Sequence, residues 1–218
     1  MKKWFLFLSM SVSLLNPLFS QSDGTDDLTK KVEMDSIMAA RKDSIKWAKL
    51  ESVAYYPLIK AGTFSGVLPV EGIDEIPSPK RQYKLLFEFT LNFKDTSHKK
   101  LNPGLVEIAR VMNLHVASGI PGSHIHPVIV VHGPSLFSIQ NNAVYQSKYK
   151  KDNPNSQLIL DLMKNGAKFI ACGQAMNFLD IKKEELYPGV KVSLTAQTVL
   201  SNYIGQGYVW YGISDENK

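Results

Sequence analysis

The feature that most constrains the fold is a regular alternation, from residue 83 to residue 213, of short apolar runs with longer segments of helical periodicity. The apolar runs, which have the composition of buried strands, are Leu85–Leu91, Pro127–Val131, Ala167–Ala171, Val190–Leu194 and Tyr208–Ile213. A helical segment of ten or more residues between two strands is typical of a crossover between parallel strands. We therefore predict an α/β fold, a three-layer sandwich with a mainly parallel five-stranded sheet and helices on both faces.

Helix boundaries carry their own signals. Asn102-Pro103 is an N-cap followed by a proline at the first helical position, and this helix is expected to end at Gly119. Asn153-Pro154 repeats the start signal, and Gly166 closes that second helix ahead of the next strand. A third helix is expected from Thr195 to Ile204.

The first twenty residues are predicted to be a secretory signal peptide. Lys2 and Lys3 precede an apolar segment from Trp4 to Leu15, and small and polar residues follow it. The apolar segment is shorter than the ~20 residues that a membrane-spanning helix needs. The mature protein is therefore expected to be periplasmic or secreted, with no membrane association after cleavage.

Residues 21–80 are predicted to be a helix followed by an extended arm. Apolar residues recur at helical spacing between Leu28 and Tyr55. Glycines and prolines then interrupt the chain as far as Lys80, so no long regular element is expected there. This arm is expected to lie over the α/β domain or over a neighbouring subunit. The predicted division is 1–20, 21–80 and 81–214.

Composition narrows the classes of partner and of chemistry. The formal net charge is +5, and no stripe of basic residues interleaved with aromatic residues is present, which argues against nucleic-acid binding. The chain has one cysteine, which excludes an internal disulfide. In an exported protein this leaves an intermolecular bridge or a free reactive thiol.

That cysteine, Cys172, follows a buried strand directly and precedes Gly173, which permits a tight turn. Ligands of open α/β sheets bind at the carboxyl ends of strands, and a thiol ahead of a helix N-terminus is biased toward the reactive thiolate. Cys172 is thus a candidate nucleophile or sulfur carrier. The alternative is a cysteine that only packs, because lone cysteines are often buried.

His132 ends the preceding strand of the sequence, just before Gly133, so its side chain is expected at the same edge of the sheet. If the two strands are neighbours, spaced ~4.8 Å, the imidazole would stabilise a Cys172 thiolate. Gln174 is a candidate for orienting a bound anion or sulfur species. Two plainer roles stay open: His132 bonds only to backbone, or Gln174 caps the following helix.

Other chemistries find little support. His124 and His126 lie two residues apart, but the loop supplies no third metal ligand at a familiar spacing. No glycine-rich phosphate loop follows Gly133, and Ser135 lacks the flanking glycines of a hydrolase nucleophile elbow. His115 lies on the apolar stripe of its helix and is expected to be a half-buried, hydrogen-bonded histidine. No metal and no cofactor are expected.

Several short motifs together resemble one known family. In order, they are Asn113-Leu114-His115, Val130-Val131-His132-Gly133, Asn153-Pro154-Asn155, Cys172-Gly173-Gln174, Leu186-Tyr187-Pro188-Gly189-Val190 and Gly207-Tyr208. From about Tyr83 to Ile213 the chain resembles the DsrE/DsrF-like family of sulfur-relay proteins. It is most similar to an exported branch that carries a signal peptide and a preceding arm, here Tyr56-Pro57-Leu58-Ile59.

The resemblance implies a flavodoxin-like α/β domain that assembles as trimers or hexamers. It also implies that a cysteine takes up sulfur as a persulfide and transfers it to a small sulfur species or to a partner protein. Combined with the strand-end argument, it predicts Cys172 and His132 as catalytic residues, with Gln174, Gly173, Gly133 and Asn113 around the substrate. The alternative function is a non-catalytic, oligomeric periplasmic module that binds a small ligand and whose cysteine only packs.

Overall fold

A computed structural model describes residues 24–91 and 98–214. The predicted signal peptide lies outside these residues. The chain divides into two units at Ala48, and each is described by itself. The described residues of the first unit all belong to α1 (Gly24–Val53), a helix of 30 residues whose last turn lies in the second unit. No helix in the described ranges has both the length and the apolar character that crossing a membrane requires.

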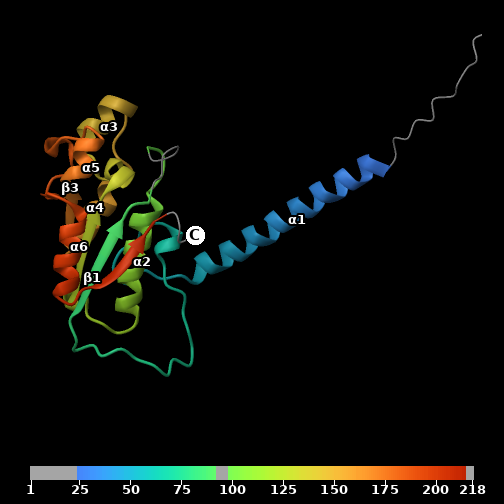
Figure 1. The fold of residues 1–218 in the computed structure, drawn as a ribbon. Helices are drawn as coiled ribbons and strands as arrows, with labels where there is room; N and C mark the ends of the chain where they lie inside the picture. The colour runs from blue at the N-terminus through green and yellow to red at the C-terminus, as the bar shows by residue number, and fades with distance from the viewer. Residues whose placement is uncertain (1–23, 92–97, 215–218) are drawn as a thin grey trace, which may run out of the picture. The chain divides into compact units, whose positions relative to one another are not determined.

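The second unit contains a sheet of five parallel strands, as predicted (Figure 1). Its order is β4-β3-β2-β1-β5, and every neighbouring pair is parallel. The strands are β1 (Tyr83–Phe89), β2 (Ile125–Val131), β3 (Lys168–Cys172), β4 (Lys191–Ser193) and β5 (Val209–Ile213). The helices of this unit are α2 (Pro103–Ala117), α3 (Asn142–Tyr149), α4 (Ser156–Lys164), α5 (Gly173–Phe178) and α6 (Ala196–Gly205). Short 3-10 turns are η1 (Thr63–Ser65), η2 (Gly122–His124), η3 (Gly133–Ile139) and η4 (Lys183–Glu185).

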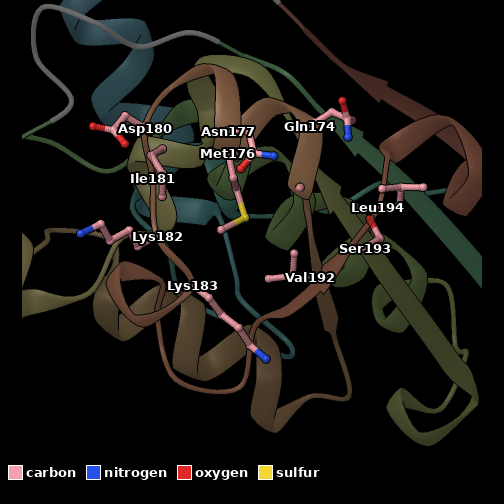
Figure 2. Close-up of a pocket in the computed structure, with 11 residues that line it drawn as sticks. Gln174, Met176, Asn177, Asp180, Ile181, Lys182, Lys183, Val192, Ser193 and Leu194 are labelled. Carbon is pink, nitrogen blue, oxygen red and sulfur yellow. The ribbon is translucent and has the colours of Figure 1, made fainter.

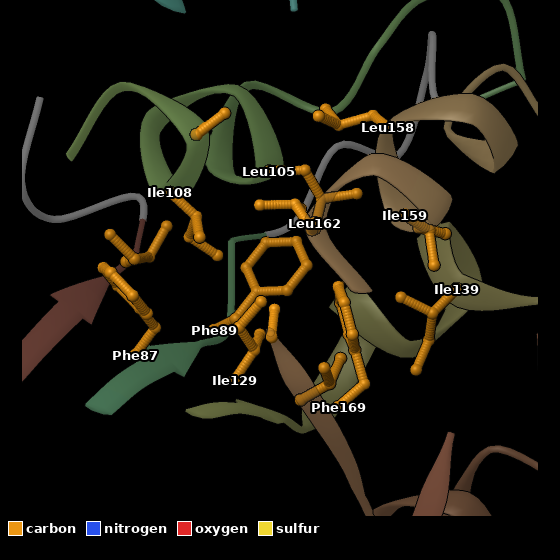
Figure 3. Close-up of a cluster of buried hydrophobic side chains, with 14 of the residues drawn as sticks. Phe87, Phe89, Leu105, Ile108, Ile129, Ile139, Leu158, Ile159, Leu162 and Phe169 are labelled. Atoms are coloured by element: carbon orange, nitrogen blue, oxygen red, sulfur yellow. The ribbon is translucent and has the colours of Figure 1, made fainter. Parts of the chain in front are cut away.

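One face of the sheet carries the larger core. Successive residues of a strand point to opposite faces, so Phe87, Phe89, Ile129 and Phe169 share one face, where all four are buried. Side chains of α2 and α4 cover them (Figure 3). The contributing helix residues shown there are Leu105, Ile108, Leu158, Ile159 and Leu162.

The opposite face has a smaller core, which is covered mainly by α6. Its strand residues are Leu86, Val128, Val130, Ile170 and Cys172. The side chains that cover them from α6 include Ala196 and Tyr203. We call this side of the sheet the α6 face.

Of the two predicted Asn-Pro helix starts, one is confirmed and one is wrong by two residues. The Asn102 side chain accepts a hydrogen bond from the Gly104 N–H at 2.8 Å and caps α2. The second helix, α4, has Asn155 rather than Asn153 as its N-cap. Asn153 is buried, and its Oδ1 accepts the Asn155 N–H at 2.9 Å, so it caps the turn that precedes α4. Its Nδ2 donates to the carbonyls of Ser138 and Gln140 and ties this turn to η3.

The arm that follows α1 packs against its own α/β domain. Tyr55 and Val67 form an isolated antiparallel bridge around the turn η1. Ile59 and Ala61 are buried in the larger core. Leu136 and Ile139 of η3 are also buried in the larger core.

Candidate functional site

The strand order brings together the two strand ends that the sequence singled out. β2 and β3 are neighbours, with Val131 opposite Ala171, so His132 and Cys172 occupy the next position along the same pair of strands. Val130 and Ile170 lie on the α6 face, and strand alternation places the side chains two residues later on that face as well. Both residues therefore lie at the carboxyl edge of the α6 face.

Cys172 is buried, with 4% of its surface exposed. Its Sγ accepts a hydrogen bond from the Ala196 N–H at 3.3 Å. Ala196 is the first residue of α6, and the side chain of the N-cap residue Thr195 bonds to none of the helix N–H groups. The sulfur thus satisfies one of the N–H groups that a helix start leaves without a partner.

His132 is bonded to a residue of β1, which flanks β2 on the side away from β3 and Cys172. Its Nε2 lies 3.0 Å from Glu88 Oε1, and about a quarter of each side chain is exposed. The second oxygen, Glu88 Oε2, accepts the indole N–H of Trp210 at 2.8 Å. Across the described residues, no hydrogen bond joins His132 to Cys172; the two are in register without direct contact between polar atoms.

The two glycines of the predicted site differ in what they contribute. Gly133 has φ +63° and begins η3 immediately after His132, a backbone conformation that glycine adopts without strain. Gly173 follows Cys172, and a Cβ there would lie 2.7 Å from the Ser193 carbonyl oxygen. Gly173 therefore permits close approach of β4 to the start of α5.

Gln174 lies on α5 and lines a pocket of about 480 Å³ beside β4. Gly173, Lys182 and Lys183 also line it, and Figure 2 shows Met176 and Val192 approaching the same space from α5 and β4. The backbone N–H of Gln174 bonds to the Leu194 carbonyl, and its side chain is exposed. Cys172 does not line this pocket.

Asn113 lies apart from these residues. It is fully buried on α2, the helix that covers the face opposite to α6. Its Oδ1 accepts the N–H groups of Leu58 and Ile59, and its Nδ2 donates to the carbonyls of Ile59 and Ser65. The structure therefore places its amide against the arm.

The histidine pair before β2 bonds to protein groups. His124 Nδ1 contacts the Pro79 carbonyl oxygen, and His126 Nε2 contacts the Gln82 side-chain oxygen. Within residues 24–91 and 98–214, no group of three or more histidine, cysteine, aspartate or glutamate side chains is arranged to hold a metal ion.

A profile described as the DsrE/DsrF-like family matches residues 84–210, which is more than half of the chain. The chain belongs to this family.

The match covers the DsrE/DsrF-like domain from β1 into β5 and so contains Cys172, His132, Gly133, Gln174 and Asn113. α1 and the arm precede it. A solved structure of a protein of unknown function, MTH1491 from Methanobacterium thermoautotrophicum, is 15% identical, with a TM-score of 0.46. The similarity covers 60% of this chain and 99% of that one. The comparison with curated proteins returned no match.

Sequence reasoning missed Glu88, which is bonded to His132, and Trp210, which is bonded to Glu88. A signal for Glu88 was available, because it is the one charged residue in the run Leu85–Leu91. A carboxylate in a strand with apolar neighbours on both sides is expected to have a partner. The identity of that partner depends on strand order, which the sequence did not reveal.

Proposed function

We propose that this DsrE/DsrF-like chain is an exported protein that carries sulfane sulfur on Cys172 as a persulfide. Family membership suggests a role in sulfur relay. One observation supports Cys172 as the residue that carries sulfur: its Sγ accepts a hydrogen bond from the Ala196 N–H at the start of α6. A helix N-terminus stabilises negative charge, and a sulfur that attacks or is released as an anion carries such charge.

The reaction is a substitution at sulfur. The Cys172 sulfur attacks the outer sulfur of a small anionic donor such as thiosulfate, and a new S–S bond forms. The S–S bond of the donor breaks, and its electron pair leaves with sulfite. The thiol proton passes to a base, so the products are the Cys172 persulfide anion, sulfite and the protonated base. No external oxidant or reductant is needed.

Burial of the thiol favours a small donor over a bulky one. Only 4% of Cys172 is exposed, and the first turn of α6 lies against its sulfur. A compact inorganic anion requires a smaller displacement of Thr195 and Ala196 than the side chain of a partner protein does. Transfer onward to an acceptor protein would require this turn to open further.

The test is mass spectrometry of the mature protein after incubation with thiosulfate or polysulfide. We expect one adduct of about 32 Da on Cys172, corresponding to one sulfur atom. It should be lost on reduction and absent from Cys172→Ser. If the folded protein acquires no adduct with either donor while the urea-unfolded protein alkylates normally, sulfur carriage at Cys172 is wrong.

A second candidate function is a non-catalytic module that binds a small ligand. It is favoured by the packing of Cys172 in the smaller core and by a pocket that the thiol does not line. Two lysines, Lys182 and Lys183, and one carboxylate, Asp180, line that pocket, so its formal charge of +1 suits a small anion. On this account, Cys172→Ser leaves anion affinity and assembly unchanged, and the native thiol alkylates slowly. Rapid alkylation of the folded protein would contradict it.

Export and assembly complete the proposal. The predicted signal peptide implies a periplasmic or secreted protein, and export of a full-length fusion with cleavage near residue 20 would test it. A homo-oligomer, trimer or hexamer, is in keeping with the exposed Val209 and Trp210 on the edge strand β5. Light scattering of the mature protein measures this directly, and a monomer at micromolar concentration would rule out the assembly.

A further inference from the structure

A row of three hydrogen-bonded side chains crosses the carboxyl edge of the α6 face and ends beside Cys172. Trp210 on β5 donates to Glu88 on β1, and Glu88 is bonded to His132, which follows β2. These three strands are adjacent in the sheet, and β3 with Cys172 is the next one. The row starts at Trp210, which has 52% of its surface exposed, and ends at His132. The next strand carries the buried Cys172, which has 4% of its surface exposed.

The donors in this row define which imidazole nitrogen is free. An indole N–H only donates, and an ionised carboxylate only accepts. Glu88 therefore accepts from Trp210 through Oε2 and from the protonated Nε2 of His132 through Oε1. In the neutral ring the proton lies on Nε2, and Nδ1 carries the unshared electron pair. No bond from Nδ1 to another protein group is found in the part of the chain that the structure describes.

His132 lies beside Cys172 at the edge of the sheet. His132 and Cys172 are in register on neighbouring strands and on the same face, one strand spacing of ~4.8 Å apart. A base acts within hydrogen-bond reach of the proton it takes or through one intervening water, and such contacts are often long without substrate. With Nε2 held toward β1, Nδ1 is the only ring nitrogen left for Cys172.

We propose that Glu88 is a positioning residue that holds His132 in the Nε2–H form, so that Nδ1 takes the Cys172 proton. This inference rests on the proposed sulfur carriage for its substrate. The thiol proton moves to Nδ1 and gives an imidazolium, whose Nε2–H stays on the Glu88 carboxylate. The freed electron pair on sulfur forms the bond to the donor's outer sulfur, and sulfite departs. The same nitrogen returns the proton when the persulfide is passed on.

The first test is the tautomer of His132, measured by ¹⁵N NMR of the histidine-labelled mature protein at a pH where the ring is neutral. The unprotonated nitrogen resonates far downfield of the protonated one. We expect Nδ1 to be the unprotonated nitrogen. In Glu88→Gln one of the two carboxylate oxygens becomes an NH2 group, which cannot accept from the residue that faces it, His132 or Trp210, so the two tautomers should become mixed. An Nδ1–H tautomer in the native protein would overturn the inference.

The second test is the rate of Cys172 alkylation by iodoacetamide at fixed pH, which needs no sulfur donor. We expect His132→Ala to slow alkylation about 100-fold, in the range of general-base effects, and Glu88→Gln about tenfold. Glu107→Gln is the matched control, because Glu107 pairs with Arg110 on α2, which covers the opposite face. It should react at the native rate.

The outcomes separate the two proposals. Equal alkylation rates in Glu88→Gln and Glu107→Gln overturn the role of Glu88, whether or not a persulfide forms. A native protein that gains no sulfur, yet whose alkylation slows in Glu88→Gln, refutes sulfur carriage and supports the positioning of His132. A persulfide in the native protein with a tenfold slower formation in Glu88→Gln supports both.

Discussion

Replacing Asn113 by alanine should detach the arm from the α/β domain. The Asn113 side chain makes four hydrogen bonds to backbone groups of the arm, at 2.7 to 3.0 Å. Each such bond contributes about 1 kcal/mol net, which gives about 4 kcal/mol for the four. Relaxation of the arm into water recovers part of the loss, because the freed backbone groups become hydrated. We therefore expect a loss of about 3 kcal/mol in the free energy of unfolding.

The matched control is Asn165→Ala, which removes one partly exposed hydrogen bond from the Asn165 amide to the Asp161 carbonyl. Its expected cost is about 1 kcal/mol or less. Urea unfolding measures both variants. Hydrogen exchange at the Leu58 and Ile59 amides reports on the arm alone, since both donate to Asn113.

Two results would refute this reasoning. One is a cost below about 1 kcal/mol for Asn113→Ala, which would mean that the four bonds add nothing net. The other is unchanged exchange protection at Leu58 and Ile59, because their acceptor would be gone. A stable variant that has lost anion or sulfur binding would instead place Asn113 at the substrate, as the sequence predicted.

Two further predictions concern stability. Gly173→Ala would place a Cβ 2.7 Å from the Ser193 carbonyl oxygen and should lower the free energy of unfolding in urea by about 1–3 kcal/mol. Gly205→Ala is the control, because Gly205 has open space around it, and it should be neutral or slightly stabilising. Equal effects of the two substitutions would contradict the close approach of β4. Burial raises the pKa of Tyr145 to about 12, above its unfolded value of ~10. The native state then keeps a proton that the unfolded state has lost, so stability that is present below pH ~10 should decline by up to about 1.4 kcal/mol per pH unit toward pH ~12. Urea unfolding of Tyr145→Phe should show a smaller decline over that range, and an identical decline would contradict the assignment.

Much of the fold followed from local signals. Strand runs such as Ala167–Ala171 were bounded by glycine, and the Asn102-Pro103 signal began α2 at the predicted residue. These signals are local because they reflect backbone preference and burial of one short segment. The second Asn-Pro pair begins a turn rather than the helix itself: Asn153 accepts the Asn155 N–H as an N-cap does, and regular α4 starts only at Ser156.

The site was harder to predict because it depends on the order of the strands and on the face of the sheet that each side chain occupies. Cys172 and Gly173 are adjacent in the sequence, yet the thiol lies on the α6 face and Gly173 lines the pocket beside α5. Glu88 and His132 are 44 positions apart and meet only because β1 and β2 are neighbours. The apolar residues around Glu88 in the sequence could have indicated that its carboxylate needed a partner, but only the order of the strands identified His132 as that partner.

The separation of thiol and pocket constrains how this DsrE/DsrF-like protein can work. Cys172 does not line the pocket beside Gln174, so an anion bound there would not contact Sγ directly. Sulfur chemistry at Cys172 therefore requires access on the α6 face, where His132 is partly exposed and the first turn of α6 covers the thiol. On the proposed mechanism, a donor that enters beside His132 leaves the Ala196 N–H on the sulfur, where it stabilises the negative charge that forms when Nδ1 takes the thiol proton. The α6 N-terminus and the imidazole of His132 would then act together on the thiol, and neither the pocket nor its lysines need take part.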